Sequence, residues 1–435
     1  MKFKEQYIYY GLCAVTAMLL IVAVINKREM KQDQLRETKK QEQSQEQKKA
    51  EEKDTGNAVI RVLIRGEGFQ EELHEKVGIT APGGLVIEYG GGREELEAQA
   101  VFEAAADHPY FASGAIRISP RQPGEKLTVT TLTRGYGVPS YGGIIELVAN
   151  GGVAVINEIS FEKYLYGVVP SEMPASYEME ALKCQAVCAR SYAYHQMQEM
   201  AYPQYQAQVD DSTAFQVYGN SEIQPSVIQA VDETAGQKLW YQGQVAAAYY
   251  YSTSCGMSTD MTAWGGSAGE ETAYLKSISI SGEQGDYEKE LPWYRWEAAI
   301  PKTVISALIS EYAETDIGNL TRLEVTERGA GGVALVLVAE GDRGSAVIET
   351  ENKIRRALGG SGYEIMKQDG NLTPARDLLP SAFFEIEEQP EQIILHGGGF
   401  GHGIGMSQNG ANEMAKQGMG YEEILKTFYC GVTIE

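Results

Sequence analysis

The sequence predicts an α+β protein in which a β-rich N-terminal part and a mixed α/β domain follow a single transmembrane helix. Three observations carry this prediction. An apolar run without charge stands near the N-terminus, short apolar runs separated by glycines follow from residue 58, and apolar residues at helical spacing begin near residue 179. Alternation with a period of two predicts half-buried strands, and recurrence every three or four residues predicts helices.

The apolar run extends from Tyr7 to Ile25. Crossing a bilayer takes about 20 residues, so residues 1–26 are predicted to form a transmembrane anchor. Basic residues flank the run on both sides, and their distribution therefore leaves the orientation open. A cleaved signal peptide is the alternative, but no small-x-small cleavage site follows the run.

The segment from Lys27 to Asn57 is rich in lysine, glutamate and glutamine and has almost no apolar residues. Such a composition cannot bury a hydrophobic core. Residues 27–57 are therefore predicted to be a disordered polar tether that holds the rest of the chain away from the membrane.

Residues 58–143 are predicted to form a β-rich accessory domain. Ala58–Ile64 combines β-branched and apolar residues, and Leu127–Leu132 alternates in the manner of a strand, with glycine-rich breaks between them. Whether this domain binds a partner or completes the fold stays open at this point.

Residues 144–435 are predicted to form one mixed α/β domain. Its helical spacing is clearest where Met179, Leu182, Ala186, Ala189 and Ala193 recur. Further elements are expected as strands at Ile144–Val148, Val153–Ile156 and Val245–Ser252, an antiparallel pair within Leu320–Gly341, and a short helix at Asn352–Leu358.

The chain is strongly acidic. It has 37 lysines and arginines against 60 aspartates and glutamates, which gives 37 − 60 = −23 as the formal net charge. Nucleic-acid binding depends on clustered basic groups, so a nucleic-acid partner is not expected. The five cysteines show no CxxC spacing and their number is odd, which predicts neither a zinc ribbon nor a disulfide framework.

Glu172 is the first candidate for chemistry, because it stands between Pro170 and Pro174 among apolar neighbours. Prolines restrict the backbone, and apolar surroundings raise the pKa of a carboxyl group toward the range that a general acid needs. The alternative is a structural residue at the N-terminus of the helix expected to follow, favoured there by the helix dipole.

A glycine-rich segment from His396 to Ala411 is the second candidate. Its glycines let the backbone approach a ligand closely, and His402, Ser407 and Gln408 supply polar groups suited to sugar binding. A turn-rich linker and a metal site built on His396 and His402 are the alternatives, although no acidic residue or cysteine stands nearby at a metal-ligand spacing.

The segment Tyr249–Met257 is the third candidate, with Ser252 and Ser254 as possible ligands for sugar hydroxyls. Cys255 could act as a nucleophile, but its own segment provides no base, and a small buried thiol is the simpler reading.

Taken together, these segments resemble the stage II sporulation protein D family of lytic transglycosylases. The resemblance runs from about residue 144 to the end of the chain, and its most specific parts are SEMPASY at residues 171–177 and GFGHGIGMSQNGA at residues 399–411. Segments around residues 156–194, 210–220 and 247–266 support it in the same order.

The resemblance implies that Glu172 is the catalytic acid and base. It also implies a reaction: cleavage of the bond between N-acetylmuramic acid and N-acetylglucosamine in glycan strands stripped of stem peptides, leaving 1,6-anhydro ends. Arg190 and Tyr192, with Ser252, Ser254, His402, Ser407 and Gln408, are the candidates for binding the sugar or supporting the oxocarbenium ion.

The family also implies partners and a location. A partner amidase, membrane proteins of the engulfment complex, and a single-pass anchor with the catalytic part outside the cell membrane are expected. Many relatives carry a His-Cys pair where this chain has Ala214 and Phe215, so neither a metal nor another cofactor is expected. A non-catalytic amidase enhancer that binds the wall is the alternative function, and a structural anchor for a wall-remodelling complex is a third.

Overall fold

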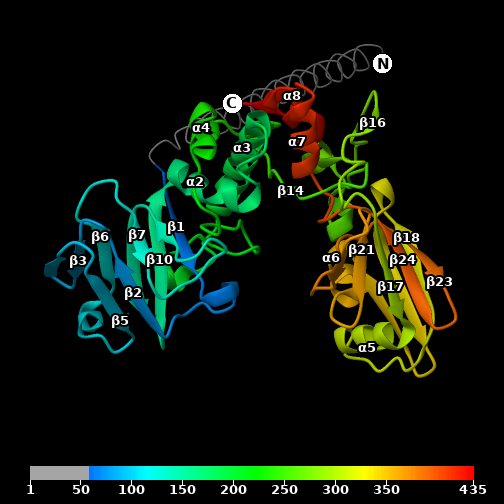
Figure 1. Ribbon diagram of the computed structural model, residues 1–435, viewed down its shortest axis with the longest axis horizontal. Helices are drawn as coiled ribbons and strands as arrows, with labels where there is room; N and C mark the ends of the chain where they lie inside the picture. The colour runs from blue at the N-terminus through cyan, green and yellow to red at the C-terminus, as the bar shows by residue number, and fades with distance from the viewer. Residues whose placement is uncertain (1–57) are drawn as a thin grey trace, which may run out of the picture. The chain divides into compact units, whose positions relative to one another are not determined.

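The computed structural model describes residues 58–435, which belong to one compact unit. The expected anchor at 1–26 and tether at 27–57 lie outside these described residues. Within 58–435, no helix combines the length and the apolar character needed to cross a bilayer. The described chain is a mixture of strands and helices with a β-rich N-terminal part, as the sequence predicts (Figure 1).

A seven-stranded sheet with the order β11-β1-β10-β9-β6-β3-β4 forms most of the N-terminal part. β1 pairs antiparallel with β10, placing Val59 opposite Ser160, and parallel with β11. The boundary expected at residue 143 therefore falls inside one sheet. The strands are β1 (Val59–Ile64), β3 (Leu85–Tyr89), β4 (Gly92–Leu96), β6 (Ile116–Pro120), β9 (Ile144–Ala149), β10 (Val153–Ser160) and β11 (Val209–Asp210).

A second sheet of four strands shares the hydrophobic core of the first. Alternate residues such as Ile60, Val62, Ile79 and Val155 are fully buried in one cluster, which is why β-branched residues recur at every second position. The four strands, in the order β5-β2-β7-β8, are β5 (Val101–Ala105), β2 (Lys76–Thr80), β7 (Leu127–Val129) and β8 (Ser140–Tyr141).

Helices extend this core beyond the sheet. α2 contacts β1 and β10 and packs on α3 and α4, while α3 also contacts the two C-terminal helices. Leu165 and Val168 of α2 are fully buried, as are Leu182 and Ala186 of α3. The helices are α2 (Phe161–Glu172), α3 (Met179–Gln196), α4 (Pro225–Glu233), α7 (Gln408–Lys416) and α8 (Tyr421–Phe428).

A module with its own sheets lies between β14 and β25 in the chain, and Figure 1 draws it in yellow to orange. Its five-stranded sheet has the order β22-β21-β17-β24-β23, and its three-stranded sheet the order β18-β19-β20. The elements are β17 (Trp296–Pro301), α5 (Lys302–Tyr312), β18 (Leu320–Arg328), β19 (Ala334–Gly341), β20 (Ser345–Glu349), α6 (Glu351–Leu358), β21 (Glu364–Lys367), β22 (Leu372–Pro374), β23 (Phe384–Glu388) and β24 (Gln392–Gly397).

Three short sheets complete the description. They consist of β13 (Gln244–Val245), β12 (Leu239–Tyr241) and β26 (Thr433–Ile434); β14 (Tyr250–Tyr251) with β25 (Met406–Ser407); and β15 (Ser281–Gly282) with β16 (Gly285–Asp286).

Most of the predicted elements are confirmed, including the antiparallel pair β18–β19 and the helix α6. The prediction of one strand over Val245–Ser252 is wrong, because only its ends pair: Val245 with Trp240, and Tyr250–Tyr251 with the distant β25. The placement of Glu172 before a helix is also wrong. Pro170 lies in the last turn of α2, where it removes one backbone hydrogen bond, and Glu172 ends that helix.

A buried ion pair joins the loop after β11 to the β-rich part. Arg134 donates to Asp211 at 2.6 Å and to the backbone carbonyls of Arg65 and Gly66, and the side chains of Arg134 and Asp211 are at most 1% exposed. Removing one member of a buried pair leaves the other charge without compensation.

We therefore expect Arg134→Met to lower the free energy of unfolding by about 3–5 kcal/mol, measured by urea denaturation. The control is Arg93→Met, which breaks an ion pair with Glu95 whose two side chains are 59% and 45% exposed and should cost less than about 1 kcal/mol. Similar losses in both variants would contradict a structural role for the buried pair.

Candidate active site

Glu172 is the last residue of α2, and its helix ends where the Met173 N–H donates to the Val169 carbonyl at 2.9 Å. A helix C-terminus carries partial negative charge, which disfavours an ionised carboxylate. The alternative of a residue stabilised by a helix N-terminus is therefore wrong. Burial raises the pKa of the Glu172 carboxyl to about 7, against a smaller lowering by a hydrogen bond from Val217.

The two carboxyl oxygens of Glu172 differ in their surroundings. Oε1 accepts the Val217 N–H at 2.7 Å. Oε2 has no hydrogen-bond partner in residues 58–435 and is not one of the completely buried unpartnered atoms, so it keeps some exposure to solvent. The loop that carries Val217 is fastened to α2, because the Asn220 N–H donates to Ser171 Oγ at 3.0 Å and the Gly219 N–H to the Gly167 carbonyl. Glu172 is thus oriented through one oxygen and free to react through the other.

The glycine-rich segment reaches Glu172 through a parallel pairing of β25 with β14, in which Tyr250 is opposite Met406. Gly405 precedes this pair with φ +76°, and a Cβ there would overlap the Tyr249 carbonyl, so the close approach requires glycine. Directly after the pair, Gln408 Nε2 donates to the Glu172 backbone carbonyl at 3.0 Å. This contact brings the glycine-rich segment beside Glu172.

The next residue, Asn409, makes a second link across the same junction. Its side chain accepts from the Tyr177 hydroxyl at 2.6 Å and donates to Thr253 Oγ1 at 2.9 Å. The residues after Glu172, the segment after β14 and the start of α7 are therefore joined by side-chain hydrogen bonds.

Tyrosines surround the Glu172 carboxyl. Burial raises the pKa of Tyr192 to about 12, and that of Tyr250 well above its ordinary value, with the charge of Glu172 contributing to both. From Tyr192 the rings continue to Tyr249, with centroids 5.8 Å apart, and from Tyr249 to Trp264 at 5.0 Å. A row of partly exposed aromatic side chains thus begins beside the candidate acid.

Comparison with known proteins places these features in a family. Residues 149–241, which contain Glu172, match the family described as Stage II sporulation protein. A stage II sporulation protein D of Bacillus subtilis is 31% identical over 64% of this chain and 75% of its own length. The chain belongs to the stage II sporulation protein D family.

Two other relatives show the breadth of the family. An uncharacterized protein of Brachyspira hyodysenteriae is 33% identical over 68% of this chain and 73% of its own length. A Bacillus subtilis protein named amidase enhancer is 30% identical over 62% of this chain, which spans only 40% of that relative. Residues 268–405, which include the inserted sheets, match a separate family described as a domain of unknown function (DUF8618).

Not every residue proposed from the family resemblance faces the Glu172 carboxyl. The Arg190 side chain is fully buried, pairs with Glu162 at 2.7 Å and donates to the carbonyls of Val231 and Gln237. Both ring nitrogens of His402 bind backbone, because Nε2 meets the Tyr250 carbonyl at 2.9 Å and Nδ1 accepts the Ile404 N–H. Burial lowers the pKa of His402 to about 3, so its ring stays neutral and supports the loop.

Ser254 and Ser407 converge on Glu288, a buried residue that the sequence analysis missed. Glu288 accepts from the Ser407 hydroxyl at 2.7 Å and from both the backbone N–H and the hydroxyl of Ser254. Burial raises the pKa of Glu288 to about 7, while these three hydrogen bonds lower it. Ser252 lies beside them, with its carbonyl accepting the Asn409 N–H at 3.0 Å. Nothing in the polar run around Glu288 distinguishes it from exposed glutamates.

His396, one of the two histidines in the alternative of a metal site, lies on β24. His396 contacts Glu297 at 3.2 Å and Glu387 at 2.9 Å across neighbouring strands, which sequence spacing did not predict. Among the described residues, no group of three or more histidine, cysteine, aspartate or glutamate side chains could hold a metal ion. Cys255 is partly buried, and burial raises the pKa of its thiol, which does not favour a thiolate nucleophile.

The raised pKa of Glu172 has a consequence for stability. A carboxyl whose pKa is higher in the folded than in the unfolded state stabilises the fold below its unfolded pKa, and this contribution is lost as the pH rises through the folded pKa. For Glu172 that window runs from 4.5 to about 7.

Glu172→Gln should therefore have a free energy of unfolding close to that of the native protein at pH 4.5 and exceed it by up to about 3 kcal/mol at pH 8. Urea denaturation across this range measures the difference, and Glu178→Gln, an exposed glutamate in the same segment, is the control. A difference between Glu172→Gln and the native protein that does not change with pH would contradict burial as the cause.

Proposed function

We propose that this protein is a lytic transglycosylase that cleaves peptide-stripped peptidoglycan between N-acetylmuramic acid and N-acetylglucosamine. The proposal rests on one observation above the others: Glu172 is a single carboxyl with a pKa near 7, held through Oε1 and without a hydrogen-bond partner at Oε2 among the described residues. Family membership supports it, because the segment with Glu172 lies within the matched residues 149–241.

The chemistry needs only this one carboxyl. In its neutral form Glu172 donates a proton to the glycosidic oxygen, and the bond from that oxygen to C1 of the muramic acid breaks. The resulting carboxylate then takes the proton from the C6 hydroxyl of the same muramic acid, and the C6 oxygen forms a bond to C1. The products are a free N-acetylglucosamine hydroxyl and a 1,6-anhydro end, and Glu172 regains its proton.

A hydrolytic mechanism fits this site less well. Glycoside hydrolases use two carboxyl groups, the second of which activates water or attacks C1. Among the described residues, no other carboxylate contributes to the shifted pKa of Glu172. Glu288 does not provide the second group, since its oxygens are occupied by Ser254 and Ser407.

Sugar recognition is proposed along the aromatic row that begins at Tyr192 and continues to Tyr249 and Trp264. Aromatic rings present apolar faces to the C–H faces of a sugar ring, and the hydroxyl of Tyr250 adds a polar group beside Glu172. Gln408 acts as a positioning residue, since it holds the Glu172 backbone rather than the carboxyl.

We further propose that the protein works outside the cell membrane during sporulation, held by the apolar run at residues 7–25. Peptide-stripped glycan requires prior removal of stem peptides, so an amidase is the partner that the reaction needs. Membrane proteins of the engulfment complex are the other partners proposed.

One observation favours a second function. A relative that is 30% identical carries the name amidase enhancer, so this chain could act by stimulating an amidase instead of cutting glycan. The two functions are separable, since an enhancer would need no proton transfer at Glu172.

Glu172→Gln should lower glycan cleavage by about 10⁴-fold, because general acid–base catalysis contributes about 10²–10⁴-fold and one residue serves both steps. Mass spectrometry of peptide-free glycan strands measures the 1,6-anhydro ends. Glu178→Gln, an exposed carboxyl six residues along, should cleave like the native protein.

Three outcomes would overturn the assignment. Reducing ends in place of anhydro ends would indicate hydrolysis, and near-native cleavage by Glu172→Gln would remove Glu172 from the chemistry. No cleavage by the native protein, with stimulation of an added amidase by both the native protein and Glu172→Gln, would establish the enhancer function.

A further inference from the structure

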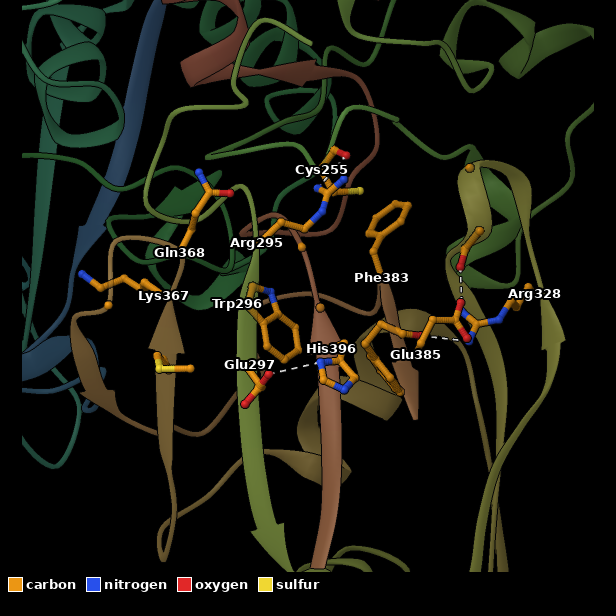
Figure 2. Close-up of a pocket in the computed structure, with 17 residues that line it drawn as sticks. Cys255, Arg295, Trp296, Glu297, Arg328, Lys367, Gln368, Phe383, Glu385 and His396 are labelled. Carbon is orange, nitrogen blue, oxygen red and sulfur yellow. Dashed lines mark hydrogen bonds and ion pairs between the residues drawn. The ribbon is translucent and has the colours of Figure 1, made fainter. Parts of the chain in front are cut away.

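One cavity described in residues 58–435 belongs to the inserted module and is not lined by Glu172. It has a volume of about 570 Å³ and lies at one end of the five-stranded sheet, where β17, β21, β23 and β24 meet the segment that carries Cys255 (Figure 2). Nothing in the proposed mechanism uses this cavity.

The charged groups that line the cavity differ in their contacts, and the histidine beside Glu297 carries a charge only when it is protonated. Glu297 contacts His396 at 3.2 Å, and Glu385 pairs with Arg328 at 2.9 Å, as the dashed lines in Figure 2 show. By contrast, Arg295 and Lys367 form no ion pair with any described residue. Two cations without a carboxylate partner are notable in a chain whose net charge is −23.

Arg295 is held in place without losing its capacity to bind an anion. Nη1 donates to the carbonyls of Cys255 at 3.0 Å and Tyr294 at 2.8 Å, and Nη2 to the Tyr294 hydroxyl at 3.2 Å. The guanidinium also stacks 3.9 Å from the centre of the Tyr294 ring. A guanidinium has five N–H donors, so these three bonds leave the Nε–H and one Nη2–H free. A planar group fixed in this way is suited to a carboxylate.

The approach of Arg295 to Cys255 depends on Gly398. A Cβ at this position would lie 2.8 Å from Cys255 Cβ and 3.1 Å from Arg295 Nη1. The glycine-rich segment thus has a role in this cavity as well as beside Glu172.

Aromatic side chains adjoin Lys367. Lys367 Nζ lies 5.6 Å from the centre of the Trp293 ring, and Trp293 contacts Phe400 with ring centroids 4.8 Å apart. Phe400 is 37% exposed although it is large and apolar. Cations beside exposed aromatic faces form a surface that suits an acidic sugar, whose ring stacks while its carboxylate is neutralised.

We propose that this cavity binds the lactyl carboxylate of muramic acid in peptide-stripped glycan, through Arg295 and Lys367, with the sugar against Trp293 and Phe400. The inference rests on the proposed function, because it names the feature of the substrate that the inserted module selects. In intact peptidoglycan the lactyl carboxyl is in amide linkage to the stem peptide and carries no charge. Removing the peptide exposes the carboxylate, so the cavity distinguishes stripped strands from intact ones.

The test measures binding by Trp fluorescence or calorimetry, with the full chain in detergent micelles and with Glu172→Gln present in every sample to prevent cleavage. Three probes separate the possible sources of binding: a peptide-free muramic acid–glucosamine oligomer, a neutral N-acetylglucosamine oligomer of equal length, and the free stem peptide. The muramic oligomer should bind at least about tenfold more tightly than the other two, since a hydrogen bond to a charged group is worth about tenfold or more.

Arg295→Gln and, independently, Lys367→Gln should each weaken binding of the muramic oligomer by about tenfold and leave the neutral oligomer unchanged. Arg343→Gln is the control, because it removes the same charge from an exposed arginine of the same module whose partner is Asp316. Two variants are used because Arg295 also contacts backbone, and thermal unfolding identifies a variant that fails to fold.

Equal binding of the muramic and neutral oligomers, or native affinity in both variants, would overturn the proposal. Equal or tighter binding of the free stem peptide would assign the cations to a peptide carboxylate instead. The binding measurements use Glu172→Gln and do not depend on cleavage. Selective binding in these measurements, combined with no glycan cleavage by the native protein, would therefore contradict the proposed function and leave the cavity proposal standing.

Discussion

The parallel pairing of Tyr250–Tyr251 with Met406–Ser407 is the contact on which the site depends. It joins two segments that the inserted module separates in the chain. A parallel pair needs a long crossover connection, and here that connection contains three sheets and the two α-helices α5 and α6. Once the pair forms, Gln408 lies against the Glu172 carbonyl and Asn409 against Tyr177 and Thr253. The orientation of Glu172 therefore depends on folding of residues far beyond its own helix.

Two buried glutamates illustrate that a raised pKa does not identify a catalytic acid. Burial raises the pKa of both Glu172 and Glu288 to about 7. Glu288 receives three hydrogen bonds from Ser254 and Ser407 and joins the segments that carry them, which accounts for its presence without any chemistry. Glu172 receives one, and its other oxygen has no partner among the described residues and is not completely buried. The two glutamates have similar pKa values, and they differ in whether a carboxyl oxygen is left without a hydrogen-bond partner.

Local patterns in the sequence predicted much of the fold, because apolar residues alternate along β9, where Ile145 and Leu147 are buried, and recur at helical spacing along α3. Burial of both faces of β10 and of nearly the whole surface of α3 goes beyond these patterns. These local patterns failed where the structure depends on contacts between residues far apart in the sequence. Glu172 was expected before a helix, yet α2, which packs on β1 and β10, continues past Pro170 and ends at Glu172. His402 was placed among the sugar ligands because histidine has two polar ring atoms, but both are used by backbone groups that only the folded loop brings near. Glu288 could not be found, since its burial follows from contacts with residues 34 and 119 positions away.

The acidic surface makes short-range recognition necessary for an anionic polymer. The net charge of −23 repels such a polymer at long range, but salt screens that repulsion beyond about 8–10 Å. At contact distance the attraction between a cation and a carboxylate is stronger than at a Debye length. Arg295 and Lys367 stand where the inserted module meets Cys255 and Gly398, which belong to the same two segments that form the β14–β25 pair. The glycine-rich segment thus lines the cationic cavity at Gly398 and orients the candidate acid through Gln408. The geometry of both sites therefore depends on the backbone conformation of this one segment.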